Sequence, residues 1–139
     1  MINSRKIEDL DEDTARLARA FVAQCLATEG IDVLITSTYR DADSQRALYN
    51  QGRSAPGQRV TNAGPGDSYH NWRMAFDFVP IVNGKAMWSD DFLWARCGAV
   101  ARKVGLEGGG DWSRFADRPH CQNTRGMTIA QLKQERTLA

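Results

Sequence analysis

The chain contains only two histidines, and each lies near an aspartate in a segment rich in aromatic or turn-forming residues. His70 lies seven residues before Asp77 in "SYHNWRMAFDF", and His120 lies in "ADRPHCQ". A donor set of two imidazoles and one carboxylate suits Zn²⁺, and three protein ligands leave a fourth position for water, as in catalytic zinc sites. We interpret His70 as carried by a loop and Asp77 as carried by the strand that follows.

Asp77 lies inside an apolar run that is typical of a buried strand. A carboxylate among apolar neighbours is unfavourable unless a positive group meets it. Alternation along a strand places Phe76 and Phe78 on the face opposite Asp77, which leaves the carboxylate free to meet a metal ion. The alternative is that His70 lies on the surface and that Asp77 forms an ion pair with an arginine such as Arg73.

Asp117 is the candidate general base, three residues before His120. A carboxylate beside a ligand histidine, but not itself a ligand, can take the proton from a zinc-bound water. Pro119 fixes the backbone between the two residues. The alternative is a solvated Asp117 paired with Arg118 or Arg114.

Arg40 ends the apolar segment "LITSTYR" and is a second catalytic candidate. A cation at this strand end could hold a substrate carboxylate or a developing oxyanion. The alternative is a surface cation paired with Asp41 or Asp43. Gln45, about one helical turn further on, is expected to be exposed on residue type alone.

Cys121, next to His120, raises the alternative of a cysteine nucleophile. Adjacent residues of a strand face opposite sides, so Cys121 is expected to point away from His120, although it could still meet His70. Three cysteines at wide spacing are not a disulfide framework, and we expect Cys25 and Cys97 to be reduced and partly buried.

The bulk composition predicts one ordinary domain spanning residues 1–139, with 42% hydrophobic and 25% charged residues. A net charge of +1 without a block of Lys or Arg gives no sign of a nucleic-acid surface. The N-terminal residues are charged where a signal peptide would be apolar, and no stretch approaches the ~18 apolar residues of a membrane span. We therefore expect cytoplasmic synthesis without a signal peptide, no nucleic-acid or membrane partner, and a monomer.

Helical periodicity, capping residues and glycine stops predict a mixture of helices and strands. An Asn83-Gly84 pair between apolar runs predicts a hairpin turn, and its antiparallel pairing favours the α+β class. The remaining predictions are helices over 7–30, 41–53, 89–105 and 127–139, strands over 31–40, within 74–88 and around His120, and a long loop over 53–67.

Three segments together resemble the successive motifs of zinc peptidases that cut peptidoglycan peptides. They are "STYRDADSQRALYNQGR", "SYHNWRMAFDF" and "GGDWSRFADRPHC", which lie between about residues 36 and 122 in the order that the family shows. The family includes VanY-like D-Ala-D-Ala carboxypeptidases, dipeptidases, and phage endolysins that are L-alanyl-D-glutamate endopeptidases. Its metal motif is similar to Ser-x-His-(x)6-Asp followed by an acid-x-x-His.

The resemblance implies an α+β fold in which helices pack on an antiparallel sheet, as in the lysostaphin-type peptidases and the Hedgehog domain. It also implies a zinc ion on His70, Asp77 and His120, with Asp117 as base. Many members of the family carry Glu where this chain has Asp117, and the shorter side chain favours the phage enzymes. The residues expected to bind substrate are Arg40, Gln45, Ser68 and Trp112.

On this resemblance we expect a zinc-dependent, endolysin-type peptidase that cleaves the stem peptides of bacterial peptidoglycan, at the L-alanyl-D-glutamate bond. It would act on the cell wall after release from the cytoplasm during phage or prophage lysis. The first alternative is a D-Ala-D-Ala carboxypeptidase or dipeptidase. The second is a catalytically silent, zinc-containing module that binds the wall, which would be expected to have lost the base.

Overall fold

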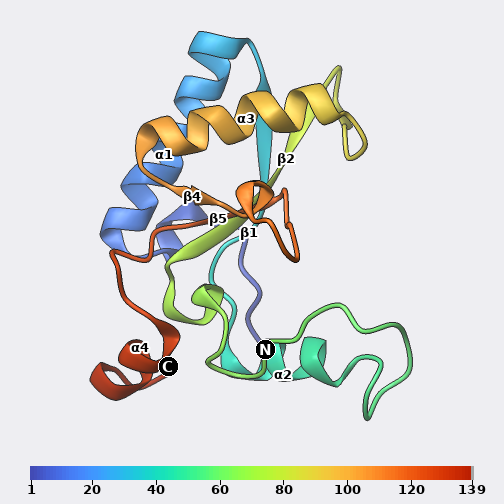
Figure 1. Ribbon diagram of the computed structural model, residues 1–139, viewed down its shortest axis with the longest axis vertical. Helices are drawn as coiled ribbons and strands as arrows, with labels where there is room; N and C mark the ends of the chain where they lie inside the picture. The colour runs from blue at the N-terminus through green and yellow to red at the C-terminus, as the bar shows by residue number, and fades with distance from the viewer. Residues whose placement is uncertain (139) are drawn as a thin grey trace.

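The computed structural model describes residues 1–138 and shows helices packed on an antiparallel sheet, the α+β fold that the sequence predicts (Figure 1). Its elements in chain order, with 3-10 helices labelled η, are η1 (Ile7–Asp9), α1 (Glu12–Glu29), β1 (Asp32–Ser37), α2 (Ala42–Asn50), η2 (Tyr69–Trp72), β2 (Ala75–Val82), β3 (Lys85–Ala86), α3 (Asp91–Val104), β4 (Glu107–Gly108), η3 (Gly109–Asp111), β5 (His120–Gln122) and α4 (Ile129–Glu135).

Strand β2 is the centre of the sheet. The strand order is β1-β2-β5-β4, and β3 also pairs with β2, with every pairing antiparallel. The predicted hairpin turn between β2 and β3 is confirmed. Asn83 and Gly84 both have positive φ, at 51° and 77°, as the favoured two-residue hairpin turn requires.

Helices α1 and α3 lie together against one face of the sheet, and the main hydrophobic core fills the space between (Figure 1). The Phe78 ring lies 4.8 Å from the ring of Phe21 on α1 and 5.3 Å from that of Trp94 on α3. Phe76 is fully buried in the same core. The predicted alternation is therefore confirmed, because Asp77 between these two residues faces the side that the core leaves open.

The first helix begins later than predicted. Instead of a helix from residue 7, the chain makes the short helix η1 and then starts α1 at Glu12. The reason is local, since Asp11 takes an extended conformation and its carboxylate accepts a hydrogen bond from the backbone N–H of Thr14. The predicted end is correct, with Gly30 in the left-handed conformation at φ 66°.

The other helix boundaries differ by a few residues. Helix α2 starts after a cap at Asp41 and ends at Asn50, before Gly52. Helix α3 is capped by Asp90 and closed by Gly105. Helix α4 occupies only part of the predicted range 127–139, the last residue of which lies outside the described residues.

A second, smaller cluster joins the C-terminal helix to the region around η2. Leu132 of α4 is fully buried against Trp72 and Met74. This packing anchors the base of the turn from which His70 projects. Among the described residues, no helix is both long enough and apolar enough to cross a membrane.

Candidate metal centre

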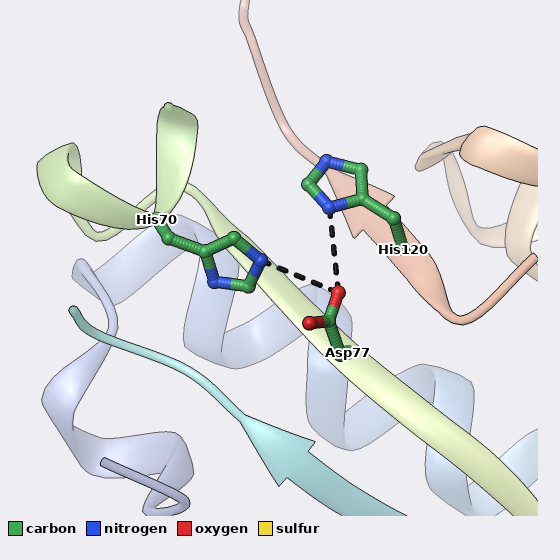
Figure 2. A group of neighbouring side chains, drawn as sticks. All are labelled: His70, Asp77 and His120. Atoms are coloured by element: carbon green, nitrogen blue, oxygen red, sulfur yellow. Dashed lines mark hydrogen bonds and ion pairs between the residues drawn. The ribbon is translucent and has the colours of Figure 1, made fainter. Parts of the chain in front are cut away.

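The structure brings His70, Asp77 and His120 together (Figure 2). One candidate ligand atom from each residue lies within 4.8 Å of the other two. The Oδ1 atom of Asp77 lies 3.3 Å from Nε2 of His70 and 3.4 Å from Nδ1 of His120. Both histidines are buried, with 3% and 8% of their surfaces exposed.

Three different elements carry these side chains. Ser68 caps η2, its hydroxyl accepting a hydrogen bond from the backbone N–H of His70, and this short helix projects the His70 ring toward β2. Asp77 and His120 are direct partners across the β2–β5 ladder, so strand pairing alone places them side by side. The loop expected to carry His70 is therefore a capped 3-10 turn, and the strand expected to carry Asp77 is β2.

The hydrogen bonds of His70 determine which of its nitrogens is free. Its Nδ1 lies 2.7 Å from the carbonyl oxygen of Thr38, which can only accept a hydrogen bond. The ring proton of neutral His70 therefore lies on Nδ1, and the lone pair on Nε2 points at Asp77. In the same way, Nε2 of His120 lies 2.7 Å from Oε1 of Gln122, which leaves Nδ1 as the lone pair toward Asp77.

Two imidazole lone pairs and a carboxylate oxygen thus converge on one buried point. Three acceptors in this arrangement repel one another unless a cation lies between them, and the set of two nitrogens and one oxygen suits zinc. The Asp77 carboxyl is ready to serve as a ligand. Burial opposes its ionisation, but the His120 and His70 rings, which can donate to the carboxylate when no metal is bound and they carry a second proton, prevail and hold its pKa far below the ordinary value.

Arg40 lies beside this group, with its Nη2 3.9 Å from Oδ2 of Asp77. Gln45 and Ser37 hold the guanidinium, through bonds of 3.0 Å from Nη1 and 3.3 Å from Nη2. Its Nε is buried and has no hydrogen-bond partner among the described residues. The alternative of a surface cation paired with Asp41 or Asp43 does not match the structure, because the Arg40 side chain is only 12% exposed and its ion pair is with Asp77. The Asp41 carboxylate instead caps α2 and accepts from the backbone N–H of Ile2.

The expectation that Gln45 is exposed is wrong. Only 1% of its surface is exposed, and its amide accepts from Arg40 while donating to the carbonyl of Ala63 at 2.8 Å. Asn71 completes the support, donating to the backbone carbonyl of Arg40 at 2.9 Å. Burial here follows from the docking of loop 53–67 over α2, which no local pattern reveals.

Asp117 opens onto the same cleft but is not one of the three clustered residues. It is exposed, and none of its side-chain atoms pairs with Arg118, which instead binds Asp91 at 2.7 Å. Partial burial of the carboxyl group, with the nearby charge of Asp77, raises the pKa of Asp117 despite the attraction of His120. Backbone bonds hold it in place, from its own N–H to the carbonyl of Gly109 and from the N–H of His120 to its carbonyl.

The cleft in front of the three clustered residues is lined by several of the residues singled out from the sequence. Ser68 and Trp112 both face it, and the Trp112 ring lies 5.4 Å from the ring of His120. Gln45 does not line it, because it lies behind Arg40. The complete lining is Arg40, Leu48, Val60, Thr61, Ala63, Asp67, Ser68, Tyr69, His70, Asp77, Trp112, Asp117, His120 and Gln122.

The alternatives built on Arg73 and Cys121 do not match the geometry. Arg73 lies over the ring of Tyr39, 3.8 Å from its centroid, and donates to the carbonyl of Asp9. Cys121 is 1% exposed and belongs to the main core, where burial raises the pKa of its thiol. Cys25 and Cys97 are also buried and free, as expected.

Sequence reasoning did not single out Thr38 or Gln122, the two residues that orient the imidazoles. Gln122 had a usable signal, because it lies two residues after His120 and shares its face of a strand. Thr38 contributes only a backbone carbonyl, and any residue type could do this. The role of Thr38 therefore leaves no pattern in the sequence.

The sequence matches known proteins over most of its length. Residues 7–107 match the family model described as VanY, D-alanyl-D-alanine carboxypeptidase. A peptidoglycan L-alanyl-D-glutamate endopeptidase of Bacillus subtilis, CwlK, is 39% identical over 105 residues, covering 69% of this chain and 63% of the relative. An L-alanyl-D-glutamate peptidase of a Listeria phage is 33% identical over 126 residues, covering 86% of this chain and 41% of the relative. The chain thus spans less than two thirds of the length of both relatives.

Solved structures show the same fold. The L-Ala D-Glu endopeptidase ChiX of Serratia marcescens superposes with a TM-score of 0.63 at 24% identity, covering 86% of this chain and 84% of that one. The LD-carboxypeptidase LdcB superposes with a TM-score of 0.58 at 16% identity, covering 92% and 70%. With the match of the family model to residues 7–107, these findings confirm the resemblance seen in the motifs, and the chain belongs to the VanY family of D-alanyl-D-alanine carboxypeptidases.

Proposed function

We propose that this protein is a zinc-dependent peptidase of peptidoglycan stem peptides and that it cleaves the L-alanyl-D-glutamate bond. The observation that carries the proposal is the convergence of three acceptor atoms, from His70, Asp77 and His120, beside an exposed carboxylate in an open cleft. Family membership supports the peptidase chemistry. The activities by which the Bacillus and phage relatives are named support the choice of bond.

His70, Asp77 and His120 would hold the zinc, which would supply Lewis-acid chemistry by polarising the scissile carbonyl and lowering the pKa of the attacking water. Asp117 accepts the proton of that water and later gives a proton to the leaving amine. Its raised pKa suits both steps, because a base that holds its proton too weakly cannot return it. The backbone of Asp117 is hydrogen-bonded to Gly109 and His120, so the carboxyl can accept and donate the proton without a movement of the main chain.

Arg40 supplies positive charge on the other side of the cleft. Its guanidinium is held by Gln45 and Ser37, so it can meet a substrate carboxylate or the developing oxyanion with little reorganisation. We therefore assign Gln45 to positioning Arg40, and Ser68 and Trp112 to contact with the peptide.

We further propose that residues 1–139 act as one catalytic domain, as a monomer, on the cell wall after release from the cell that makes the protein. The stem peptide carries free carboxylates, and Arg40 provides a matching charge. Neither nucleic acid nor membrane has a role in this proposal.

One experiment distinguishes the proposed function from two others. D-Ala-D-Ala carboxypeptidase activity is favoured by the description of the matching family, and a silent wall-binding module is disfavoured by the presence of Asp117. Purified peptidoglycan is incubated with the zinc-loaded protein, and the fragments are identified by mass spectrometry. New L-alanine carboxyl ends support the proposal, released D-alanine supports the carboxypeptidase, and bound but intact peptide supports the module.

A further inference from the structure

A chain of polar side chains leads from the metal centre to the edge of the sheet. Nε2 of His120 lies 2.7 Å from Oε1 of Gln122, and Nε2 of Gln122 donates to Oε2 of Glu107. Gln122 is buried, whereas Glu107 on β4 is exposed. Glu107 and Gln122 are direct partners in the β4–β5 ladder, and strand alternation places Gln122 on the same face as His120.

We propose that Glu107 and Gln122 form a relay that selects which nitrogen of His120 is free to bind the metal. The inference rests on the proposed metal centre, but not on which peptide bond is cut. Both are positioning residues in this proposal, because they act through His120 and neither is a metal ligand.

The direction of the relay follows from the chemistry of its ends. The carboxylate of Glu107 can only accept hydrogen bonds, so the NH₂ group of Gln122 must face it. The amide oxygen of Gln122 then faces His120 and requires a proton on Nε2. Neutral imidazole carries one proton, so Nδ1 is left as a lone pair toward Asp77.

Among the described residues, no side-chain hydrogen bond of Gln122 other than that to Glu107 fixes this order. A flipped amide would present its NH₂ group to Nε2 of His120, which would then have to accept. The ring proton would move to Nδ1, where it blocks the metal position. His70 needs no such relay, because the Thr38 carbonyl that holds its Nδ1 is part of the backbone and cannot exchange a donor for an acceptor.

Substitutions at the two relay positions test the proposal through zinc affinity, measured by competition with a chromogenic chelator. Loss of a side chain that orients a metal-ligating histidine typically weakens metal binding ~10–100-fold. We expect Gln122→Ala near the upper end of that range and Glu107→Ala near the lower end. Glu135→Gln, which neutralises an exposed carboxylate on α4, is the control and should leave the affinity unchanged.

Exchanging the two relay residues provides the sharper test. In Gln122→Glu the carboxylate meets that of Glu107, so zinc binding should weaken. In the double variant Glu107→Gln/Gln122→Glu, the new carboxylate accepts from His120 on one side and from the new amide on the other. The order of donors is thereby restored, and the zinc affinity should return to within about threefold of the wild type. The effects of the two substitutions on zinc affinity would then not add, as is expected only of residues in one hydrogen-bond network.

A spectroscopic measurement separates this role from general structural support. Nitrogen NMR of the metal-free protein at about pH 9, where histidine is neutral, distinguishes the two ring tautomers. Wild type and the double variant should show His120 with its proton on Nε2, and Glu107→Ala should show a mixture. Unchanged zinc affinity and tautomer in Glu107→Ala, or a double variant no better than Gln122→Glu, would overturn the relay. A wild-type protein that binds no zinc would instead overturn the metal centre itself.

Discussion

The same substitution at the two aspartates of the site should lower activity in both cases but remove the metal in only one. Asp117→Asn keeps the size and shape of the side chain but removes its ability to accept a proton. Loss of a general base typically lowers the rate ~10²–10⁴-fold, so peptide release should fall by that factor. Zinc content should stay near one per chain, because Asp117 lies outside the three clustered residues. Stability should change by less than about 0.5 kcal/mol, since Asp117 is exposed.

Asp77→Asn should lose metal and activity together. Its carboxylate oxygen is the one atom that contacts both histidines, at 3.3 and 3.4 Å, and an amide oxygen there carries no charge. At free zinc a thousand times the dissociation constant, binding contributes about 4 kcal/mol to the stability of the folded state. A chain of this size shifts its Tm by roughly 3 °C per kcal/mol, so zinc should raise the Tm of Asp117→Asn by about 12 °C and that of Asp77→Asn by much less.

The assay combines elemental analysis, thermal unfolding with and without zinc, and mass spectrometry of fragments released from peptidoglycan. Each variant is compared with the wild type at equal protein concentration. Wild-type rates in Asp117→Asn would refute its assignment as the base. Full zinc content in Asp77→Asn would refute its assignment as a ligand, whatever the activity.

Four further results are expected from the same geometry. Zinc affinity should fall as the pH is lowered through the pKa of His120, because the added proton competes with the metal for the ring. Burial lowers this pKa, but the bond with Asp77 prevails and raises it above the ordinary 6.5. In the metal-free protein, the pair of His120 and Asp77 should add to the free energy of unfolding as the pH falls to 6.5, because the folded-state pKa of His120 is raised. This stabilisation should be lost only below the ordinary 3.8 of Asp77, because the folded-state pKa of that carboxyl is lowered. Unfolding at a series of pH values measures both changes in stability. Cys121→Ser should retain most lytic activity, since the thiol lies in the core, and loss of activity with zinc and fold intact would restore the cysteine nucleophile. Gln45→Ala should lower kcat/KM about tenfold while zinc content is unchanged, because it frees the guanidinium of Arg40, and an unaltered rate would show that this support is unnecessary.

Short-range chemistry made much of the molecule predictable from its sequence. The hairpin at Asn83 and the helix stop at Gly30 depend on residues within a few positions of one another. Alternation along a strand was enough to place Asp77 opposite its phenylalanine neighbours and Cys121 away from His120. The candidate ligands could be named because histidine is rare in this chain and the motif as a whole resembles a known family.

Burial and long-range pairing were not predictable in this way. The family match ends at residue 107, yet Asp117 and His120 lie beyond it, and pairing of β5 with β2 brings His120 to Asp77. Gln45 resembles any exposed helical glutamine until a distant loop covers it.

The sequence by itself therefore predicted which side chains could bind a metal and which carboxylate could act as a base. Only the tertiary structure decided which nitrogen of each histidine faces the metal position. That choice depends on hydrogen bonds to residues far along the chain, from His70 to the carbonyl of Thr38 and from His120 through Gln122 to Glu107. A tautomer is a property of what the ring touches, and those contacts form only when the sheet closes.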